Sequence, residues 1–383
     1  MKIARISTIQ PSLSILLGGQ LAFLSNNGYE VYTISGEGGN YVDFVKREKI
    51  KEHHMISLTR PISLIKDLKA LLECYLLFRR IKPDIIHSIT PKAGLIAMLA
   101  GYLAGVPVRI HTFTGLIFPY KKGLFQKILI FMDKILCRCA THIYPEGQGV
   151  KNDLIKYNIT KKPLKIIGNG NVNGVDLNHY NPSDYSEVFK NEFRESLNID
   201  REDFVFIFVG RLVGDKGINE MVVAFKHFCK NNFHVKLLLV GPFEEGLDPL
   251  KPETLIEIEQ NSQIINVGYQ EDVRPFFAVS DALIFPSYRE GFPNVVLQAG
   301  AMGLPCIVTD ISGCNEIIAQ GKNGIIIPVK DEGAILGAFM QMFENKDLRL
   351  KLSEEARHMI ASRFDQKSLW EAILIEYNSF KRV

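Results

Sequence analysis

The chain has 383 residues, of which 46% are hydrophobic and 23% charged, with a formal net charge of +3. This length predicts two or three domains, and this composition is ordinary for a soluble globular protein with good cores. The longest apolar run, from Leu95 to Val108, contains two glycines and a proline and is too short to cross a bilayer, which excludes a membrane-spanning helix.

Strand and helix patterns alternate along the chain, which is typical of parallel α/β domains. The first half has predicted strands at Lys2–Thr8, Glu30–Ser35, Asp84–Ser88, Val106–His111, His142–Pro145 and Lys165–Ile167. The second half has them at Phe204–Val209, Val235–Val240, Ile264–Val267, Ala282–Phe285, Cys306–Thr309 and Gly324–Ile327. A Gly- and Asn-rich segment, 168–176, separates the two series and reads as a linker.

The N-terminal segment and the cysteines indicate the cellular compartment of the protein. Met1–Thr8 reads as a first strand and not as a signal peptide. The six cysteines are scattered without metal-ligand spacing, which indicates free thiols in a reducing compartment. We therefore expect a cytoplasmic protein, peripheral on the inner face of the plasma membrane if it binds membranes at all.

Charge is unevenly distributed along the chain. Residues 1–170 contain 24 Lys and Arg against 11 Asp and Glu, and the remainder contains 21 against 31. A basic half favours an anionic partner such as an acidic lipid or a phosphorylated acceptor. Nucleic acid is not expected, because no nucleic-acid-binding motif accompanies the charge. A solvated basic face without a role would give the same numbers.

The segment 281–300 carries the most specific chemistry. A buried strand pattern, Ala282–Phe285, leads to Glu290, a Gly-Phe-Pro turn and a helix that opens near Asn294. A strand end that meets a helix N-terminus is a frequent ligand site, and its backbone N–H groups favour an anion. Diphosphate on the helix end and hexose against the carboxylate would suit a nucleotide sugar.

Two cations follow the strand Phe204–Val209. Arg211 comes directly after Gly210, and Lys216 lies five residues further on, before Gly217. Both can converge on one diphosphate, where they would stabilise the charge that develops as the nucleotide leaves. An ordinary strand-end arginine and a surface lysine would leave the same pattern. No Asp-x-Asp pair occurs, so we expect the two cations to replace a metal, and we expect no cofactor.

These motifs together resemble glycosyltransferase family 4. The resemblance rests on Glu290 with Gly-Phe-Pro, on Val209-Gly-Arg-Leu212 with Lys216-Gly217, and on Gly18-Gly19 after the first strand, and it extends over essentially the whole chain. It implies the GT-B fold, an α/β architecture of two Rossmann-like domains that face each other across a cleft. An acceptor-binding domain would comprise 1–170 plus 365–383, because the last helix crosses back, and a donor-binding domain would comprise 171–364.

The resemblance also implies roles for single residues. Arg211, Lys216, Glu290 and His111 would be catalytic, with Thr114 as the alternative to His111. The expected donor-binding residues are Gly18, Gly19, Gly291, Phe292, Asn294, Val295 and Gln298. Gln298 departs from the family, which usually has a second acidic residue there. His87 reads as structural.

The resemblance implies a retaining transfer of a hexose or N-acetylhexosamine from a UDP-sugar. Residues 115–138 mix Phe, Leu and Ile with five basic residues, a pattern of helices that bind anionic membranes and also of helices packed on a core. Membrane contact would favour a polyprenyl-diphosphate-linked saccharide acceptor in surface polysaccharide biosynthesis. Two alternatives stay open: a GT-B sugar-nucleotide 2-epimerase, and a non-catalytic sugar-nucleotide-binding subunit.

Overall fold

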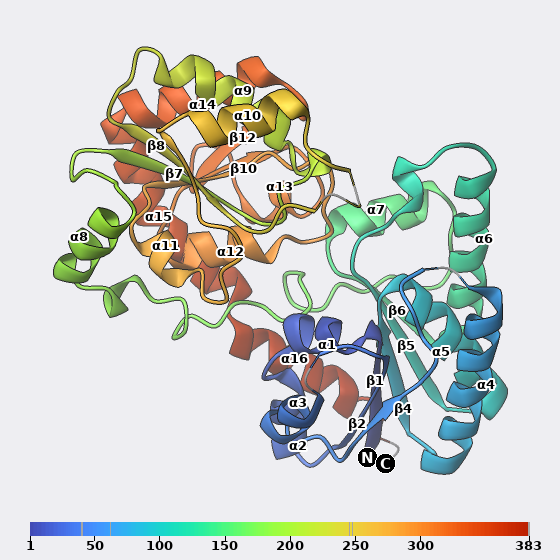
Figure 1. Ribbon diagram of the computed structural model, residues 1–383. Coiled ribbons are helices and arrows are strands. Elements are labelled where there is room, and N and C mark those ends of the chain that lie inside the picture. Colours follow the sequence, from blue (N-terminus) through green and yellow to red (C-terminus); the bar gives the residue numbers. More distant parts are fainter. Residues whose placement is uncertain (40, 62, 245, 247, 382–383) are drawn as a thin grey trace. The chain divides into compact units, whose positions relative to one another are not determined.

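The computed structural model describes residues 1–39, 41–61, 63–244, 246 and 248–381. The chain divides into two compact units (Figure 1). Unit 1 comprises Met1–Asn173 and Gln366–Val383, and unit 2 comprises Gly174–Asp365. Each unit contains one six-stranded parallel sheet.

The sheet of unit 1 has the order β3-β2-β1-β4-β5-β6. Its strands are β1 (Lys2–Ile9), β2 (Glu30–Gly36), β3 (Glu52–Met55), β4 (Ile85–Ile89), β5 (Val108–Phe113) and β6 (His142–Pro145). The order reverses between β1 and β4, so the carboxyl ends of these two strands flank a switch point. Their inner residues are buried on both faces, which explains the near-continuous apolar runs that identify them in the sequence.

Helices cover both faces of this sheet. The helices are α1 (Gln10–Leu17), α2 (Gln20–Asn26), α3 (Tyr41–Arg47), α4 (Leu64–Ile81), α5 (Pro91–Ala104), α6 (Gly123–Cys139), α7 (Gln148–Lys156) and α16 (Gln366–Asn378), and Phe118–Tyr120 forms a 3₁₀ turn. One apolar cluster joins the sheet to α4, α5, α6 and α7, and another joins it to α1, α2, α3 and α16. In Figure 1 α4, α5 and α6 form one layer, with α5 in the middle.

The last helix, α16, packs into unit 1 through polar contacts as well as apolar ones. Tyr377 is fully buried, and its hydroxyl lies 2.9 Å from Nη1 of Arg5 and 2.5 Å from Nδ1 of His87. Nε2 of His87 contacts Oγ1 of Thr112 at 2.7 Å. Burial holds the pKa of His87 well below its usual value, so this histidine is a neutral link between the sheet and α16.

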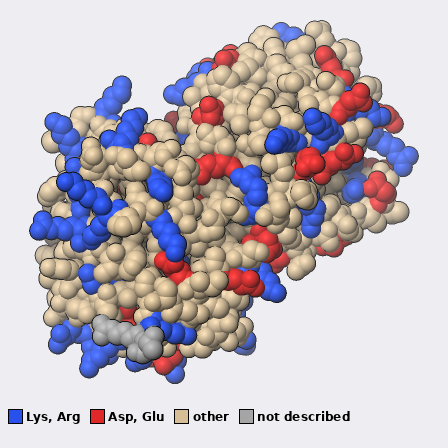
Figure 2. Space-filling view, turned by 180° about the vertical axis from the view of Figure 1, so that it is seen from behind, with Lys and Arg blue, Asp and Glu red and all other residues tan. Residues whose placement is uncertain are grey.

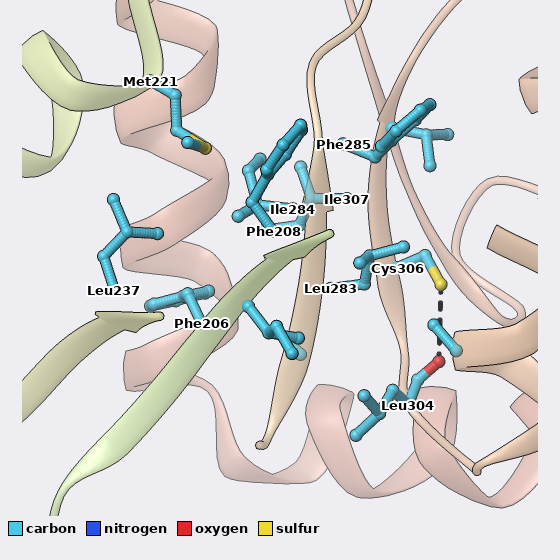
Figure 3. Packing of buried hydrophobic residues seen from close by; sticks show 14 of the residues in the cluster. Phe206, Phe208, Met221, Leu237, Leu283, Ile284, Phe285, Leu304, Cys306 and Ile307 are labelled. Carbon is cyan, nitrogen blue, oxygen red and sulfur yellow. Dashed lines mark hydrogen bonds between the residues drawn. The ribbon is translucent and has the colours of Figure 1, made fainter. Parts of the chain in front are cut away.

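The sheet of unit 2 has the order β12-β11-β10-β7-β8-β9. Its strands are β7 (Phe204–Val209), β8 (Val235–Val240), β9 (Ile264–Asn266), β10 (Ala282–Phe285), β11 (Cys306–Thr309) and β12 (Gly324–Ile327). Figure 3 shows Phe206 and Phe208 of β7 beside Leu283 and Ile284 of β10 in the core between strands and helices. The switch point of this sheet lies between β7 and β10.

The helices of unit 2 flank this sheet. They are α8 (Glu187–Ser196), α9 (Ile218–Cys229), α10 (Pro252–Gln260), α11 (Arg274–Ala278), α12 (Asn294–Ala301), α13 (Cys314–Ile317), α14 (Glu332–Glu344) and α15 (Lys346–Phe364), with 3₁₀ turns at Pro182–Asp184 and Gly214–Lys216. Among the described residues, no helix is both long and apolar enough to cross a membrane.

Apart from shifts of one residue at the ends of β1, β2 and β4, three differences separate the predicted elements of unit 1 from the structure. The predicted strand Lys165–Ile167 is absent, because the chain makes only an isolated bridge there, between Ile143 and Leu164. The strand expected at Val106–His111 begins and ends two residues later, since Pro107 has no N–H to offer the ladder. The edge strand β3 was not predicted, because Glu52-His-His-Met55 lacks the apolar pattern of a strand.

Candidate functional site

The loops that follow β7 and β10 meet at the switch point of unit 2. The backbone N–H of Tyr288 donates to the carbonyl of Asp215 at 2.9 Å, and Oγ of Ser287 donates to the same carbonyl at 3.3 Å. Thr309, at the end of β11, donates its hydroxyl to the carbonyl of Ser287. The carboxyl ends of three neighbouring strands are thus tied together at one place, where open α/β sheets bind ligands.

Two glycines allow these loops to approach so closely. Gly217 has a φ of +72°, and a Cβ on it would lie 2.2 Å from the carbonyl oxygen of Pro286. Gly313 has a φ of +77°, and a Cβ there would lie 2.4 Å from the carbonyl oxygen of Gly291. A side chain at either position would push the loops apart, which accounts for Gly217 directly after Lys216.

Lys216 and Glu290 form an ion pair in the middle of this junction. Their side chains are 15% and 17% exposed, respectively. Oγ of Ser287 donates to Oε1 of Glu290 at 2.8 Å, and Nζ of Lys216 lies 5.4 Å from the centre of the Phe285 ring. The two residues expected to contact diphosphate and hexose separately are therefore neighbours, 74 positions apart in the sequence.

Arg211 is the most exposed of the predicted catalytic residues. Its side chain is 47% exposed and forms an ion pair with Glu244, in the loop after β8. Arg289 pairs with Asp215 at 2.7 Å on the other side of the Lys216 loop. Arg211 and Lys216 come from one loop, but each is held by a carboxylate from another strand end.

The helix α12 begins at Asn294, as predicted, and Pro293 precedes it as the N-terminal cap. Phe292 is buried against Phe364, with ring centres 5.5 Å apart, so it anchors the turn. Gln298 lies one turn after Asn294 and is partly exposed. Within the described part of the chain, its side chain has no hydrogen-bond partner. Gly291, Asn294, Val295 and Gln298 therefore lie around one helix N-terminus.

Gly18 and Gly19 lie in unit 1 and are separated from β1 by α1. The N–H of Gly19 donates to both carboxylate oxygens of Glu48, each at 3.0 Å, and Glu48 is 1% exposed. A Cβ on Gly19, whose φ is +78°, would lie 2.6 Å from the Trp370 ring. These contacts explain on structural grounds why a glycine occupies position 19. The donor-binding assignment of Gly18 and Gly19 remains a prediction.

His111 does not end its strand as expected, because β5 continues to Phe113, and His111 is completely buried. Nδ1 of His111 lies 2.8 Å from Oγ of Ser88, and a Cβ on Gly94 of α5 would touch the ring. Burial lowers the pKa of His111 to about 3, so the ring is neutral. Thr114, the first residue after β5, is partly exposed.

The remaining ionisable groups add no further ligand set to the site. All six cysteines are buried, and burial raises the pKa of the Cys314 thiol, with Glu290 adding to the effect. In the ranges that the structure describes, no group of three or more His, Cys, Asp or Glu residues could hold a metal ion.

Comparisons with known proteins identify the family and the fold of the chain. The model of "Glycosyltransferase Family 4" matches residues 21–176, and that of "Glycosyl transferases group 1" matches residues 189–359. The capsular polysaccharide biosynthesis glycosyltransferase CapM of Staphylococcus aureus is 30% identical over 380 residues, which cover 99% of this chain and 97% of the relative. The chain belongs to the family 4 glycosyltransferases.

Other members of the family and solved structures extend the comparison. An Escherichia coli UDP-Gal:α-D-GlcNAc-diphosphoundecaprenol α-1,3-galactosyltransferase is 29% identical, over 90% of this chain and 88% of the relative. The crystal structure of Anabaena HepE in complex with UDP and glucose superimposes with a TM-score of 0.83 at 18% identity, over 99% of this chain and 100% of that one. The fold of this glycosyltransferase is thus GT-B, with two Rossmann-like units.

Sequence reasoning missed the carboxylates and hydroxyls that support the cations of this glycosyltransferase. Glu244 belongs to the loop after β8, and nothing in its surroundings marks it as a partner of Arg211. Ser287 is completely buried and holds Glu290 in place. Its position two residues after β10 was the only available signal, because buried hydroxyls at strand ends seldom lack a partner.

Proposed function

We propose that this enzyme transfers a hexose or N-acetylhexosamine from a UDP-sugar to a polyprenyl-diphosphate-linked saccharide, with retention and without a metal ion, in surface polysaccharide biosynthesis. The observation that carries the proposal is the pairing of Lys216 with Glu290 just before the N-terminus of α12, with Arg211 in the same loop as Lys216. The two cations and the helix N-terminus suit the negatively charged diphosphate of a nucleotide sugar, and the carboxylate suits the hydroxyl groups of its sugar. The relatives' names supply the nucleotide and the lipid-linked acceptor.

In the proposed mechanism the acceptor hydroxyl oxygen forms a bond to the anomeric carbon as the bond from that carbon to the diphosphate oxygen breaks. The attack comes on the face from which the diphosphate leaves, and the departing phosphate oxygen takes the acceptor proton. Arg211 and Lys216 stabilise the charge that grows on the diphosphate. Glu290 accepts hydrogen bonds from the transferred sugar, and its contact with Lys216 places hexose and phosphate side by side.

The other predicted site residues complete the proposal. Backbone groups at Gly291, Phe292, Asn294 and Val295 bind the diphosphate at the helix end, and Gln298 binds the ribose one turn further on. From unit 1 we assign the contact near the transferred sugar to Thr114 in place of the buried His111.

Membrane contact is part of the proposal, and the exposed residues of unit 1 support it. On α6 the apolar residues Leu124, Phe125, Ile128 and Phe131 are between 44% and 74% exposed, among exposed lysines. On α4 a stripe at every fourth position, Leu64, Leu68, Leu72 and Leu76, is between 57% and 84% exposed. Over unit 1, Lys and Arg side chains outnumber Asp and Glu on the face in Figure 2. Apolar helix faces bordered by cations suit an anionic bilayer surface.

The test is release of UDP from a panel of UDP-sugars, with and without a polyprenyl-diphosphate-linked saccharide. We expect release that depends on the acceptor, an α-linked product, and full activity in excess EDTA. Interconversion of free UDP-sugars without an acceptor would instead indicate an epimerase. Binding of UDP without any turnover would indicate a non-catalytic subunit, and loss of activity in EDTA that Mg²⁺ restores would contradict the metal-independent mechanism.

A further inference from the structure

A cavity of about 350 Å³ lies within unit 1, at the carboxyl ends of β1, β4 and β5. Its volume is in the range of small-molecule sites and more than twice that of a cavity that holds benzene. The helices α4, α5 and α6 supply part of its wall, and the ends of the strands and the segment after β5 supply most of the rest. The catalytic and donor-binding residues assigned above do not line it.

The cavity wall is apolar on one side and polar on the other. The apolar side chains are Ile9, Leu95, Ile96, Phe113, Leu116, Ile117, Phe118, Leu129 and Met132. The polar side includes Thr8 and Thr90, whose hydroxyl oxygens lie 2.9 Å apart at the ends of β1 and β4. Thr90 has a φ of 96°, an outlier for a β-branched residue, and such strain persists mainly where the surroundings enforce it.

Positive charge lies at the polar end of the cavity. Arg60 is exposed and, within the described ranges, has no carboxylate partner, whereas Lys92 pairs with Asp67 at 2.7 Å. A second hollow adjoins the cavity and shares Ile9 and Arg60 with it. Lys66, Lys69, Glu37 and Glu73 also line this hollow, and Lys69 pairs with Glu73 at 3.8 Å, so Arg60 and Lys66 are its cations without a carboxylate partner among the described residues. An elongated ligand can therefore place an apolar part in the cavity and an anionic part on Arg60 and Lys66.

One partly buried carboxylate, that of Asp133, lies among the apolar residues of the wall and does not oppose this ligand. Asp133 of α6 lines the cavity, and no other described residue hydrogen-bonds to it or forms an ion pair with it. Burial raises its pKa to about 7, so a large fraction is uncharged at neutral pH. Arg60, Asp67 and Lys92 are the other charged residues of the cavity wall, and Cys137 lies one turn further along α6.

We infer that this cavity binds the lipid diphosphate part of the acceptor, with the first isoprene units among Leu95, Leu129 and Met132 and the diphosphate on Arg60 and Lys66. The inference rests on the proposed function for the acceptor class, and it adds the site where that acceptor is held. The helices α4 and α6 line the cavity and also carry exposed apolar residues, so a lipid chain can pass from the membrane surface to the cavity. Apolar burial supplies affinity, and charge selects a phosphorylated lipid.

Binding of farnesyl diphosphate to the full chain, measured by titration calorimetry below its critical micelle concentration, tests the site. We expect saturable binding, with farnesol and inorganic diphosphate each at least about tenfold weaker, which is 1.4 kcal/mol per factor of ten. Dihexanoyl phosphatidylglycerol distinguishes a membrane phospholipid from an isoprenoid diphosphate. Equal affinity for that phospholipid, or no binding of farnesyl diphosphate, would overturn the inference.

Two variants with matched controls locate the binding. Leu129→Trp fills the cavity and Arg60→Glu reverses its charge, and each should weaken binding at least about tenfold. Ile155→Trp on α7 and Arg79→Glu on α4 make the same changes at exposed positions of unit 1 outside the cavity and should bind as wild type. Because Arg60 is exposed, its variant keeps the test decisive if Leu129→Trp fails to fold. Unchanged binding in Arg60→Glu would exclude the site.

The same proteins separate this inference from the proposed function. If the cavity variants lose farnesyl diphosphate while no UDP-sugar is turned over with any acceptor, the site stands and the proposed transfer is wrong. If wild type transfers sugar to a lipid-linked acceptor but Leu129→Trp and Arg60→Glu keep the wild-type acceptor KM, transfer stands and the cavity assignment is wrong.

Discussion

Lys216 and Glu290 neutralise each other's charge, so a substitution of either residue affects the stability of the fold as well as catalysis. Both are largely buried and paired, so loss of one leaves the other charge without its partner. Arg211 and Glu244 are 47% and 32% exposed, and water can compensate there. The same chemical role therefore carries a different structural cost at the two cations.

We predict that Arg211→Ala and Lys216→Ala each lower kcat by about 10²-fold, because each removes stabilisation of charge that develops in the transition state. Only Lys216→Ala should also lower the free energy of unfolding, by roughly 1–3 kcal/mol, since Glu290 remains buried without its partner. Acceptor-dependent UDP release and thermal unfolding measure the two effects. Near-normal turnover in both variants would remove this site from the mechanism.

At Gln298 we predict a change in donor affinity and not in turnover. An amide offers the ribose one acceptor oxygen and an NH₂ donor, whereas a carboxylate accepts from both hydroxyls with its charge strengthening each bond. Gln298→Glu should therefore leave or lower the donor KM, and Gln298→Ala should raise it, by on the order of 1 kcal/mol in binding. Glu290→Ala should mainly lower kcat. If Gln298→Ala left the donor KM unchanged while UDP still bound, Gln298 would have no contact with the ribose.

The sequence identified Lys216 and Glu290 as candidates but not as a pair. Their types and their places after predicted strands were visible, yet 74 residues separate them, and only the sheet order brings β7 next to β10. For His111 it is the position, and not the role, that differs from the expectation. The sequence placed it at the end of its strand, but β5 continues two residues further and His111 lies in the core.

At the scale of elements, most strands of unit 2 were predicted with their observed bounds, whereas the edge strand β3 of unit 1 was not predicted. The bounds of β7, β8, β10, β11 and β12 agree with the sequence-based ranges, because strands buried on both faces have continuous apolar runs between polar turns. The edge strand β3 has only partly buried residues between exposed ends, and so no pattern marks it. Pairing with β2 creates it, which is a tertiary effect that local sequence does not contain.

The pH dependence of thermal stability tests whether the Asp133 carboxyl of α6 is buried. The folded-state pKa of Asp133 is about 7, above its ordinary value of 3.8, so the native state holds this proton more tightly than the unfolded state does. The contribution of Asp133 to stability is therefore most favourable below pH 4 and falls as pH rises toward 7. Asp133→Asn should raise Tm at pH 8, with a smaller gain at pH 5.

Each kcal/mol of change in the free energy of unfolding shifts Tm by about 2–4 °C for a unit of this size. Glu371→Gln, at an exposed position of α16, is the control and should shift Tm equally at both pH values. A Tm difference between Asp133→Asn and wild type that did not grow from pH 5 to pH 8 would mean that the Asp133 carboxyl is not desolvated.

At the scale of the whole molecule, the surplus of basic residues and the exposed apolar faces of α4 and α6 belong to the same unit. Residues 1–170 have 24 Lys and Arg against 11 Asp and Glu, and α4 and α6 carry exposed leucines and phenylalanines. We propose that attraction to anionic lipid brings the enzyme to the membrane and that insertion of apolar side chains retains it there. The two contributions respond differently to salt, and this difference separates them.

We predict that the purified enzyme co-sediments with vesicles that contain phosphatidylglycerol at low salt and partly detaches as salt rises, because the Debye length falls from about 10 Å at 0.1 M to 3 Å at 1 M. Replacing Lys121, Lys122 and Lys127 by Glu should abolish most of the binding, whereas the same change at Lys322, Lys346 and Lys351 of unit 2 should not. Replacing Leu68 and Phe131 by Ser should lower the fraction that still binds at high salt, since those side chains supply the contribution that salt does not screen. Equal binding to neutral and anionic vesicles would show that charge does not bring this enzyme to the membrane.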